Sequence, residues 1–223
     1  ELLDQVRAEH ATRYLQNTRL PLSTIAYMIG FNDASNFRRA YLKWTGRSPS
    51  EVRHGGGYQV VDTEGGHADY APIDDVQSAV VNCLRERYGR VSLERLLSGK
   101  GILNIYLALC SIEGVEAQFE SPAEVVAAAL EHQDDRALQT LHMFCEGMGS
   151  AAGNLALTFG AKGGIYIAGG VIPRFQEFFI NSGFRSKFED KGRFVSYLQP
   201  IPVYLVIRSN LGLLGAAKKL QQI

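Results

Sequence analysis

Val61-Asp-Thr-Glu-Gly-Gly-His-Ala-Asp-Tyr70 is the stretch around which the rest of the 223-residue chain is organised. A β-type run over residues 58–62 leads into two glycines, which separate Glu64 from His67. Neither glycine carries a Cβ, so a ligand could approach the backbone closely. A carboxylate and an imidazole held on a turn suit a polyhydroxylated ligand, because each forms directional hydrogen bonds with hydroxyl groups. A tight hairpin with both side chains in solvent explains the same spacing equally well.

The composition is that of an ordinary soluble protein with one large domain or two unequal ones. The formal net charge is zero, but residues 1–57 carry 8 Lys/Arg and 5 Asp/Glu, whereas residues 58–223 carry 15 and 18. A small basic part joined to a larger acidic part indicates two modules with different partners.

The cysteine and hydropathy patterns favour a cytoplasmic protein. Three widely spaced cysteines argue for free thiols and against a zinc site; they are Cys83, Cys110 and Cys145. No apolar run reaches about 18 residues, so no membrane span is expected. The chain begins inside a helical pattern without an initiator Met, and we therefore expect it to be trimmed there.

The first part of the chain reads as three helices over residues 2–16, 22–29 and 34–44. The apolar face of the first helix is predicted to carry Leu3, Val6, His10 and Tyr14. Gly30 ends the second helix, and Asn32 or Asp33 can cap the third. The buried stripe of the third helix is predicted to be Phe37, Ala40, Tyr41 and Trp44.

The opposite face of the third helix carries Ala34, Ser35, Arg38 and Arg39. A helix, a glycine turn and a second helix with exposed arginines form a helix-turn-helix pattern. Arginine can form bidentate contacts with guanine, and small residues let such a helix lie close to DNA. A solvated helix face without DNA contacts is the alternative interpretation.

Ile25-Ala-Tyr-Met-Ile-Gly-Phe-Asn-Asp-Ala-Ser-Asn-Phe-Arg-Arg-Ala-Tyr41, followed by Trp44-Thr-Gly-Arg-Ser-Pro-Ser-Glu-Val-Arg53, resembles the end of the DNA-binding domain of AraC-type regulators. Members of that family have two helix-turn-helix units joined by a long helix, and only the joining helix and the second unit have counterparts here. The resemblance implies that Ala34, Ser35, Arg38 and Arg39 face the bases. Because phosphate contacts supply most of the affinity, we expect weak DNA binding by this half of the family's domain.

His54-Gly-Gly-Gly57 is predicted to be a flexible joint between domains 1–53 and 58–223. The second domain reads mainly as helices, separated by turns that include Ser98-Gly-Lys-Gly101; the helices cover residues 73–88, 93–97, 103–112, 122–131 and 134–159, with a final one over 213–222. Ser121-Pro-Ala-Glu124 is a capping box.

Gly163-Gly-Ile-Tyr-Ile-Ala-Gly-Gly-Val-Ile-Pro-Arg174 reads as a buried strand, a glycine pair and a helix start near Pro173. Such a corner lets a nucleotide lie against the backbone, although plain turns share the pattern. The corner is not a P-loop, because no Gly-Lys-Ser/Thr follows. Residues 201–207 are expected to form a second strand.

Residues 58–223 resemble the C-terminal portion of bacterial glucokinases, which belong to the actin-like ATPase superfamily. The matching motifs are Glu64-Gly-Gly-His67, Glu94 before Ser98-Gly99, Gly153-Asn-Leu-Ala-Leu157, Gly164-Ile-Tyr-Ile-Ala-Gly-Gly-Val-Ile-Pro-Arg-Phe175, Phe188-Glu-Asp-Lys-Gly-Arg-Phe194 and Gly212-Leu-Leu-Gly215. The expected fold is therefore mixed α/β, with a small helix-turn-helix segment joined to part of an actin-like ATPase domain.

The resemblance implies that Glu64, His67 and Glu94 bind glucose and that Gly169 and Gly170 line the adenosine side of a site for ATP with Mg²⁺. No resident metal site in the protein is expected. The family's phosphate loops and its Asn-Asp pair, whose Asp is the catalytic base, have no counterpart before residue 58. We therefore expect no catalytic residue here, doubtful ATP binding and negligible kinase activity.

The resemblance also implies that the final helix packs on an N-terminal lobe. Leu213, Leu214 and Leu220 are then expected to be exposed, with a homodimer or another lobe covering them. Three functions remain open: a glucokinase portion that binds sugar, a DNA-binding regulator with an attached sugar sensor, and a join of two unrelated fragments without a combined function.

Overall fold

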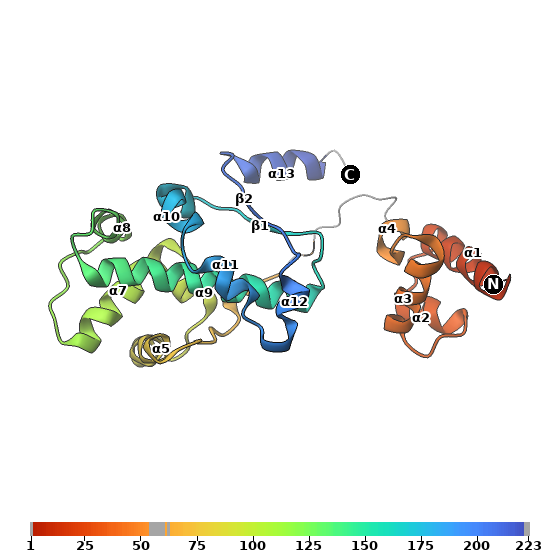
Figure 1. The fold of residues 1–223 in the computed structure, drawn as a ribbon. Coiled ribbons are helices and arrows are strands. Elements are labelled where there is room, and N and C mark those ends of the chain that lie inside the picture. Colours follow the sequence, from red (N-terminus) through yellow and green to blue (C-terminus); the bar gives the residue numbers. More distant parts are fainter. Residues whose placement is uncertain (1, 54–60, 62, 221–223) are drawn as a thin grey trace. The chain divides into compact units, whose positions relative to one another are not determined.

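The structure is a computed structural model that describes residues 2–53, 61 and 63–220. They form two compact units, Glu1–Thr63 and Glu64–Ile223 (Figure 1). The fold class is mixed α/β, as predicted, because helices dominate and a small parallel sheet lies in the second unit. The predicted joint over residues 54–57 and most of the predicted β-type run over 58–62 lie outside the described residues.

The first unit consists of four helices, α1 Leu2–Asn17, α2 Leu22–Met28, α3 Ala34–Thr45 and α4 Pro49–Arg53. Their core is made by buried side chains from all four helices, chiefly Leu15, Ile25, Phe37, Tyr41 and Val52. Asp33 caps α3, because its carboxylate accepts the backbone N–H groups of Ser35 and Asn36. These N–H groups stabilise the anion and hold the pKa of Asp33 below its ordinary value.

The predicted apolar face of α1 is wrong except at Tyr14, which is half-buried and packs against the core. Leu3 and Val6 are 61% and 43% exposed, whereas Ala11 and Leu15 are buried. The reason is that α1 packs against α3 and α4, and the small side chain of Ala11 permits a close approach there. The spacing of apolar residues in the sequence had instead predicted that the larger ones face the core.

The second unit is a helical body with two short strands. Its helices and strands follow the chain in this order: η1 Gly65–His67, α5 Asp75–Tyr88, α6 Leu93–Leu96, α7 Gly99–Glu113, α8 Pro122–Leu130, α9 Asp135–Phe159, β1 Ile165–Ile167, η2 Ile172–Phe175, α10 Gln176–Ile180, α11 Phe184–Glu189, η3 Gly192–Phe194, α12 Val195–Leu198, β2 Val203–Leu205 and α13 Leu211–Leu220.

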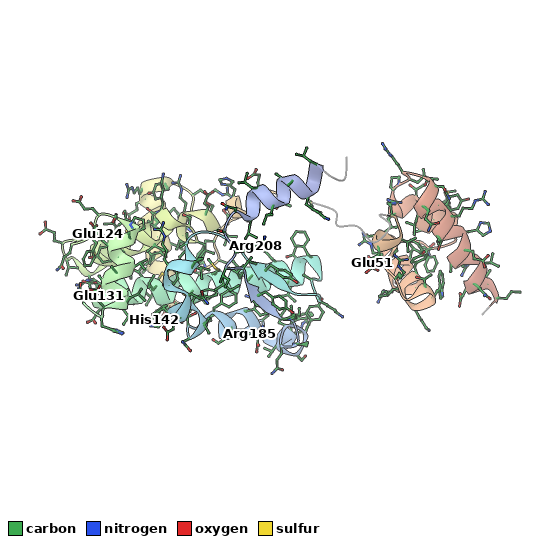
Figure 2. The ribbon with its side chains drawn as sticks, turned by 90° about the horizontal axis from the view of Figure 1, so that it is seen from above. Glu51, Glu124, Glu131, His142, Arg185 and Arg208 are labelled. Atoms are coloured by element: carbon green, nitrogen blue, oxygen red, sulfur yellow. The ribbon has the colours of Figure 1, made fainter. Side chains whose placement is uncertain are left out.

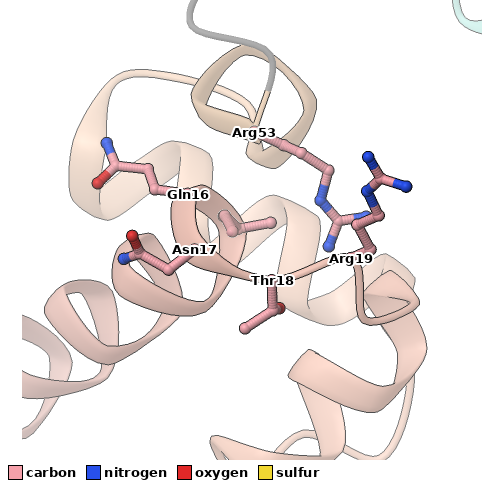
Figure 3. A pocket seen from close by; sticks show the side chains of 6 residues that line it. Gln16, Asn17, Thr18, Arg19 and Arg53 are labelled. Carbon is pink, nitrogen blue, oxygen red and sulfur yellow. The ribbon is translucent and has the colours of Figure 1, made fainter.

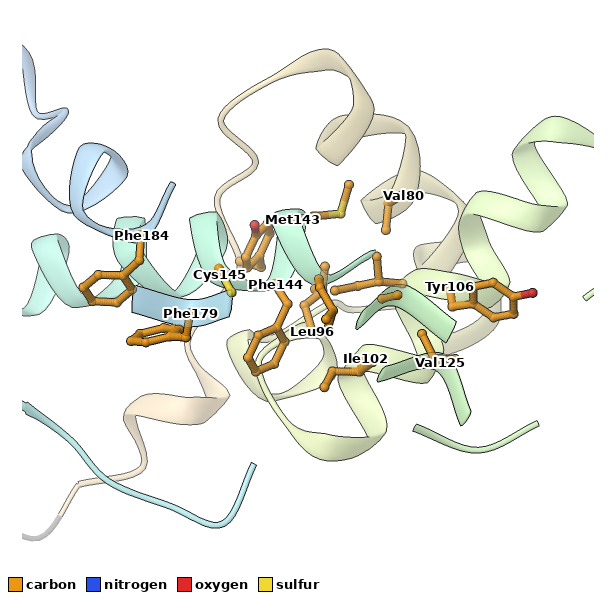
Figure 4. Packing of buried hydrophobic residues seen from close by; sticks show 14 of the residues in the cluster. Val80, Leu96, Ile102, Tyr106, Val125, Met143, Phe144, Cys145, Phe179 and Phe184 are labelled. Carbon is orange, nitrogen blue, oxygen red and sulfur yellow. The ribbon is translucent and has the colours of Figure 1, made fainter. Parts of the chain in front are cut away.

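The core of this unit lies around α9, which contacts α7, α8 and α11 (Figure 4). The helix is unbroken through Gly147, Gly149 and Gly153. An ideal Cβ on Gly149 would lie 2.2 Å from the carbonyl oxygen of Phe184, and one on Gly153 would lie 2.4 Å from that of Phe188. Two glycines of α9 therefore let α11 pack directly on its backbone.

The sheet consists of β1 and β2, which pair in parallel with Ile165 opposite Val203. The prediction of a buried strand is wrong, since Tyr166 is 66% exposed. A sheet of two described strands leaves one face in solvent, where the rings of Tyr166 and Tyr204 stack with centroids 4.9 Å apart.

The segment predicted as a glycine turn, Ser98–Gly101, instead begins a helix. Helix α7 starts at Gly99, and the Ser98 side chain accepts the backbone N–H of Gly101. An ideal Cβ at position 101 would lie 2.2 Å from the carbonyl oxygen of Leu96. Gly101 is thus required by the close approach of α6 and α7, not by a turn.

The capping box of α8 is confirmed, with Ser121 and Glu124 satisfying each other's backbone N–H groups. Arg185 of α11 donates hydrogen bonds to the backbone carbonyls of Gln199 and Ile201, 2.7 and 2.9 Å away, and so links α11 to the segment before β2. Figure 2 labels Glu124 and Arg185 among the drawn side chains.

All three cysteines are free thiols, as predicted. Burial raises the pKa of Cys145 to about 12, so this thiol stays protonated at neutral pH. Over the described ranges, no helix is both long and apolar enough to cross a membrane. The same residues include no group of three His, Cys, Asp or Glu side chains placed to hold a metal ion.

Replacing Asp134 should make the stability of the second unit less dependent on pH. This carboxylate caps α9 through the Ala137 N–H and contacts Arg136 at 2.6 Å. Burial favours its neutral form, but these donors more than offset burial, and the pKa of Asp134 lies below its ordinary value. Its stabilising contribution is therefore present above the unfolded-state pKa, about 3.9, and is lost as the pH falls through the folded-state pKa.

Urea unfolding followed by circular dichroism measures this effect. Asp134→Ala should lower the unfolding free energy by about 1 kcal/mol near neutral pH, because the cap is lost. Asp134→Asn keeps a capping side chain without the charge, so its difference from the original chain should shrink in acid. A difference that stays constant from neutral pH to about pH 3 would contradict the assigned role of the anion.

Candidate functional site

The loop that carries Glu64 and His67 is fixed against α6 by backbone hydrogen bonds. The N–H of Leu93 donates to the carbonyl of Ala68 at 2.9 Å, and the N–H of Tyr70 donates to that of Val91 at 3.1 Å. These bonds bring the first turn of α6, which contains Glu94, next to η1.

The three side chains predicted to bind a sugar lie together on this surface. The Nε2 atom of His67 is 3.5 Å from Oε2 of Glu94 and 3.9 Å from Oε2 of Glu64. The side chains of Glu64, His67 and Glu94 are 90%, 63% and 60% exposed, respectively. Two carboxylates that accept hydrogen bonds and an imidazole that can donate or accept one therefore face solvent together. They lie close enough for one ligand with several hydroxyl groups to contact all three.

A buried platform supports this loop. The Tyr70 hydroxyl donates to Oε1 of Gln77 at 2.6 Å, and burial raises the pKa of Tyr70 far above its ordinary value. The hydroxyl therefore remains a proton donor throughout the neutral range. An ideal Cβ on Gly147 would lie 2.5 Å from this hydroxyl, so α9 packs tightly behind the loop.

The glycine pair after β1 borders two hollows rather than one. Gly170 lines a cavity of about 700 Å³ between the start of α7, α8 and η2, whereas Gly169 lines a smaller one of about 270 Å³ beside the sheet. Gly169 has a φ of +145°, and no heavy atom lies within 4 Å of an ideal Cβ on either glycine. The backbone is thus open to a ligand at this corner.

Two cationic residues at the larger cavity were absent from the predicted site. Lys100 and Arg174 line it together with apolar residues such as Ile102 and Val126. In the sequence, Lys100 belongs only to the Ser98–Gly101 segment that was expected to be a turn. Neither spacing nor composition could place it beside Arg174, because tertiary packing alone brings α7 and η2 together.

The predicted DNA-facing residues share one side of α3. Ser35, Arg38 and Arg39 are exposed, while Ala34 is half-buried. The Nη2 atom of Arg39 donates to Oδ1 of Asn36 at 2.5 Å, whereas Arg38 forms no hydrogen bond or ion pair with any described residue. Arg38 is therefore the side chain of this face that is not held by a neighbour.

The dipeptide Asn32-Asp33 has the same two residue types as the Asn-Asp pair that contains the catalytic base in the resembling glucokinases, but it has a different role here. It lies in the first unit, and the Asp33 carboxylate is engaged with backbone N–H groups at the start of α3. Capping thus accounts for Asp33.

Comparison with known proteins identifies the larger part of the chain. Residues 48–223 match the family model described as Glucokinase, which is more than half of the chain. The chain belongs to the glucokinase family. Residues 1–55 match a second family model, described as a helix-turn-helix domain.

Curated glucokinases align with the chain over about half of their own length. The glucokinase of Hahella chejuensis is 53% identical over 161 residues, which cover 72% of this chain and 50% of that protein. The glucokinase of Tolumonas auensis is 46% identical over 183 residues, which cover 82% and 57%.

Solved glucokinase structures share the fold of the second unit. The crystal structure of glucokinase from an Antarctic psychrotroph has a TM-score of 0.69 and 37% identity, and the match covers 74% of this chain and 51% of that one. The crystal structure of Balamuthia mandrillaris glucokinase in complex with glucose has a TM-score of 0.61, with 67% and 44% covered. At 17% identity, this second similarity is one of fold.

Proposed function

We propose that residues 58–223 are the sugar-binding portion of a glucokinase, which holds glucose through Glu64, His67 and Glu94. The observation that carries this proposal is the meeting of the three side chains, which come from η1, the residue before it and α6. Carboxylates accept hydrogen bonds from sugar hydroxyls, and charged acceptors form the stronger bonds of this kind.

The site would bind glucose without transferring phosphate. Its three groups face solvent. The family's base and phosphate loops have no counterpart in residues 1–57, where the helix-turn-helix lies. Phosphoryl transfer depends on positioning a magnesium-bound nucleotide against the attacking hydroxyl. The site can therefore bind glucose without transferring a phosphoryl group to it.

We propose the cavity beside Gly170 as the place for the adenosine side of ATP. Its volume, about 700 Å³, lies in the range of small-molecule sites, and apolar side chains of α7 and α8 would cover an adenine ring. Gly169 and Gly170 would let the nucleotide lie against the backbone, with Lys100 and Arg174 at the rim for its anionic part. ATP would supply the phosphoryl group; these residues would only hold and orient it.

Glu64→Ala should weaken glucose binding by about 10- to 100-fold. Loss of a hydrogen bond to a charged group costs about 1.5–3 kcal/mol, and Glu64 has no buried contacts whose loss would alter the fold. Isothermal titration calorimetry is the suitable measurement, because the only tryptophan, Trp44, lies in the other unit.

Glu86→Ala is the matched control for this experiment. Glu86 is an exposed carboxylate of α5 that forms no ion pair with a described residue, so its removal changes the net charge equally. Equal glucose affinities in the Glu64 and Glu86 variants would refute the assignment of Glu64.

We also propose that residues 1–53 bind DNA through a face of α3 that carries Ala34, Ser35, Arg38 and Arg39. The helix-turn-helix match and the exposed arginines of this face support the proposal. Binding of a DNA duplex by the full chain, measured with and without glucose, tests it. A glucose-dependent affinity would favour a sugar-responsive regulator, whereas independent binding of both ligands would favour two uncoupled parts joined through residues 54–57.

The C-terminal helix offers an apolar surface that we propose is covered by another lobe or a second copy. Leu213 and Leu220 are each 73% exposed, and Leu214 is 42% exposed. We also propose a cytoplasmic location, because all three cysteines are free thiols.

A further inference from the structure

A pocket of about 500 Å³ lies at the end of α1 in the first unit (Figure 3). Its lining consists of Leu15, Gln16, Asn17, Thr18, Arg19 and Arg53. Two of these six residues are cations and none is a carboxylate. The pocket is thus electrostatically suited to an anion.

Arg53 is held in this pocket by one hydrogen bond of its guanidinium group. Its Nη2 atom donates to the backbone carbonyl of Leu20 at 2.6 Å, which fixes the guanidinium against the segment before α2. Its Nε atom is buried and has no hydrogen-bond partner among the described residues. The Nη1 atom of Arg53 is not buried in this way and has no hydrogen-bond partner among the described residues, so it can donate to an acceptor that enters the pocket.

Arg19 supplies the second positive charge. Neither Arg19 nor Arg53 forms a salt bridge with any residue that the structure describes. Two guanidinium groups lining one pocket repel each other until an anion lies between them. Their planar forks match the oxygen geometry of a phosphate better than that of a spherical ion such as chloride.

The position of the pocket indicates which phosphate it would take. The carbonyl bound by Arg53 belongs to Leu20, two residues before α2 begins at Leu22. In a helix-turn-helix, the first helix crosses the DNA backbone while the second enters the major groove. Helix α2 is that first helix here, so the pocket at its start would meet the backbone.

We propose that Arg19 and Arg53 bind one backbone phosphate of DNA and thereby position α3. This inference rests on the proposed DNA binding of residues 1–53. The pocket would add affinity for DNA of any sequence, because phosphate contacts fix the register of a protein on DNA but do not read its sequence. The base-facing side chains of α3 lie outside this pocket.

The test compares the salt dependence of duplex binding by the full chain. Fluorescence anisotropy with a random-sequence duplex is measured over a series of salt concentrations for the original chain, Arg19→Gln and Arg13→Gln. Loss of one phosphate contact should reduce the slope of log K against log salt by about 0.9. Arg13→Gln is the charge-matched control, since Arg13 is exposed on α1 and does not line the pocket, and its slope should match that of the original chain.

Nitrogen-15 NMR of the Arg53 Nε–H group provides a readout that does not depend on a substitution at position 53. Duplex addition should shift this signal at low concentration, and inorganic phosphate at equal ionic strength should shift it only at a much higher concentration. A shift with inorganic phosphate but not with the duplex would show a small-anion site and overturn the DNA assignment. No shift with either would overturn the pocket itself.

Failure of the pocket can be told from failure of DNA binding. If the original chain binds the duplex and Arg19→Gln has an unchanged salt slope, the pocket assignment is wrong while DNA binding stands. If the original chain binds no duplex at low salt, the proposed DNA binding fails, and the phosphate assignment fails with it.

Discussion

The 223-residue chain is expected to phosphorylate glucose at least about 10²–10⁴-fold more slowly than a full-length glucokinase. That factor is the usual contribution of a general base alone, and the phosphate loops that we expect to be absent would add to it. In the proposed site Glu64, His67 and Glu94 hold the sugar, and we expect no group of residues 1–57 to activate its hydroxyl.

A coupled assay of glucose 6-phosphate formation measures this rate. The host's own glucokinase is the main source of error, so the Glu94→Ala variant purified in the same way is the control. Equal residual rates in the two samples would identify contamination. Turnover of about 1 s⁻¹ or faster that disappears in Glu94→Ala would contradict the prediction.

The largest loss of stability is expected for Gly149→Ala, at about 3 kcal/mol. The added methyl group would lie 2.2 Å from the carbonyl oxygen of Phe184, a backbone atom that cannot rotate away. Helices α9 and α11 would have to separate, and overpacking in a tight core costs about 1–3 kcal/mol or more. The substitution would therefore disrupt the contact between α9 and α11.

Denaturant unfolding followed by near-ultraviolet circular dichroism detects this change. Gly163→Ala is the control, because no heavy atom lies within 4 Å of an ideal Cβ at that position. Trp44 fluorescence reports the first unit separately and should show the same transition in all three proteins. Equal midpoints for the Gly149 and Gly163 variants would show that the helices adjust without cost.

Local sequence signals predicted the elements whose cause is itself local. Asp33 and Ser121 cap their helices as expected, because a cap depends only on a side chain and on a backbone N–H two or three residues away in the sequence. The position of Gly101 was misread as a turn, since the neighbour that requires glycine there is the carbonyl of Leu96 in another helix.

The candidate site was predictable only in part for the same reason. Glu64 and His67 share one loop, and the meeting with Glu94 followed from the family resemblance. Lys100, Arg174 and the Arg19–Arg53 pocket depend on which helices pack together, which no spacing in the sequence reveals. Likewise, the face of α1 was misjudged because small Ala11, not a large apolar residue, faces α3 and α4.

The contrast between α9 and the two-stranded sheet sets an order for the exchange of amide hydrogens with solvent. Helix α9 is 25 residues long and has buried residues along most of its length, so its amides should open only when the whole unit unfolds. The strands β1 and β2 are three residues each and have one face in solvent, so their amides should exchange through local opening. The corner that carries Gly169 and Gly170 follows β1 directly and would therefore sit on the part of the unit that opens most readily.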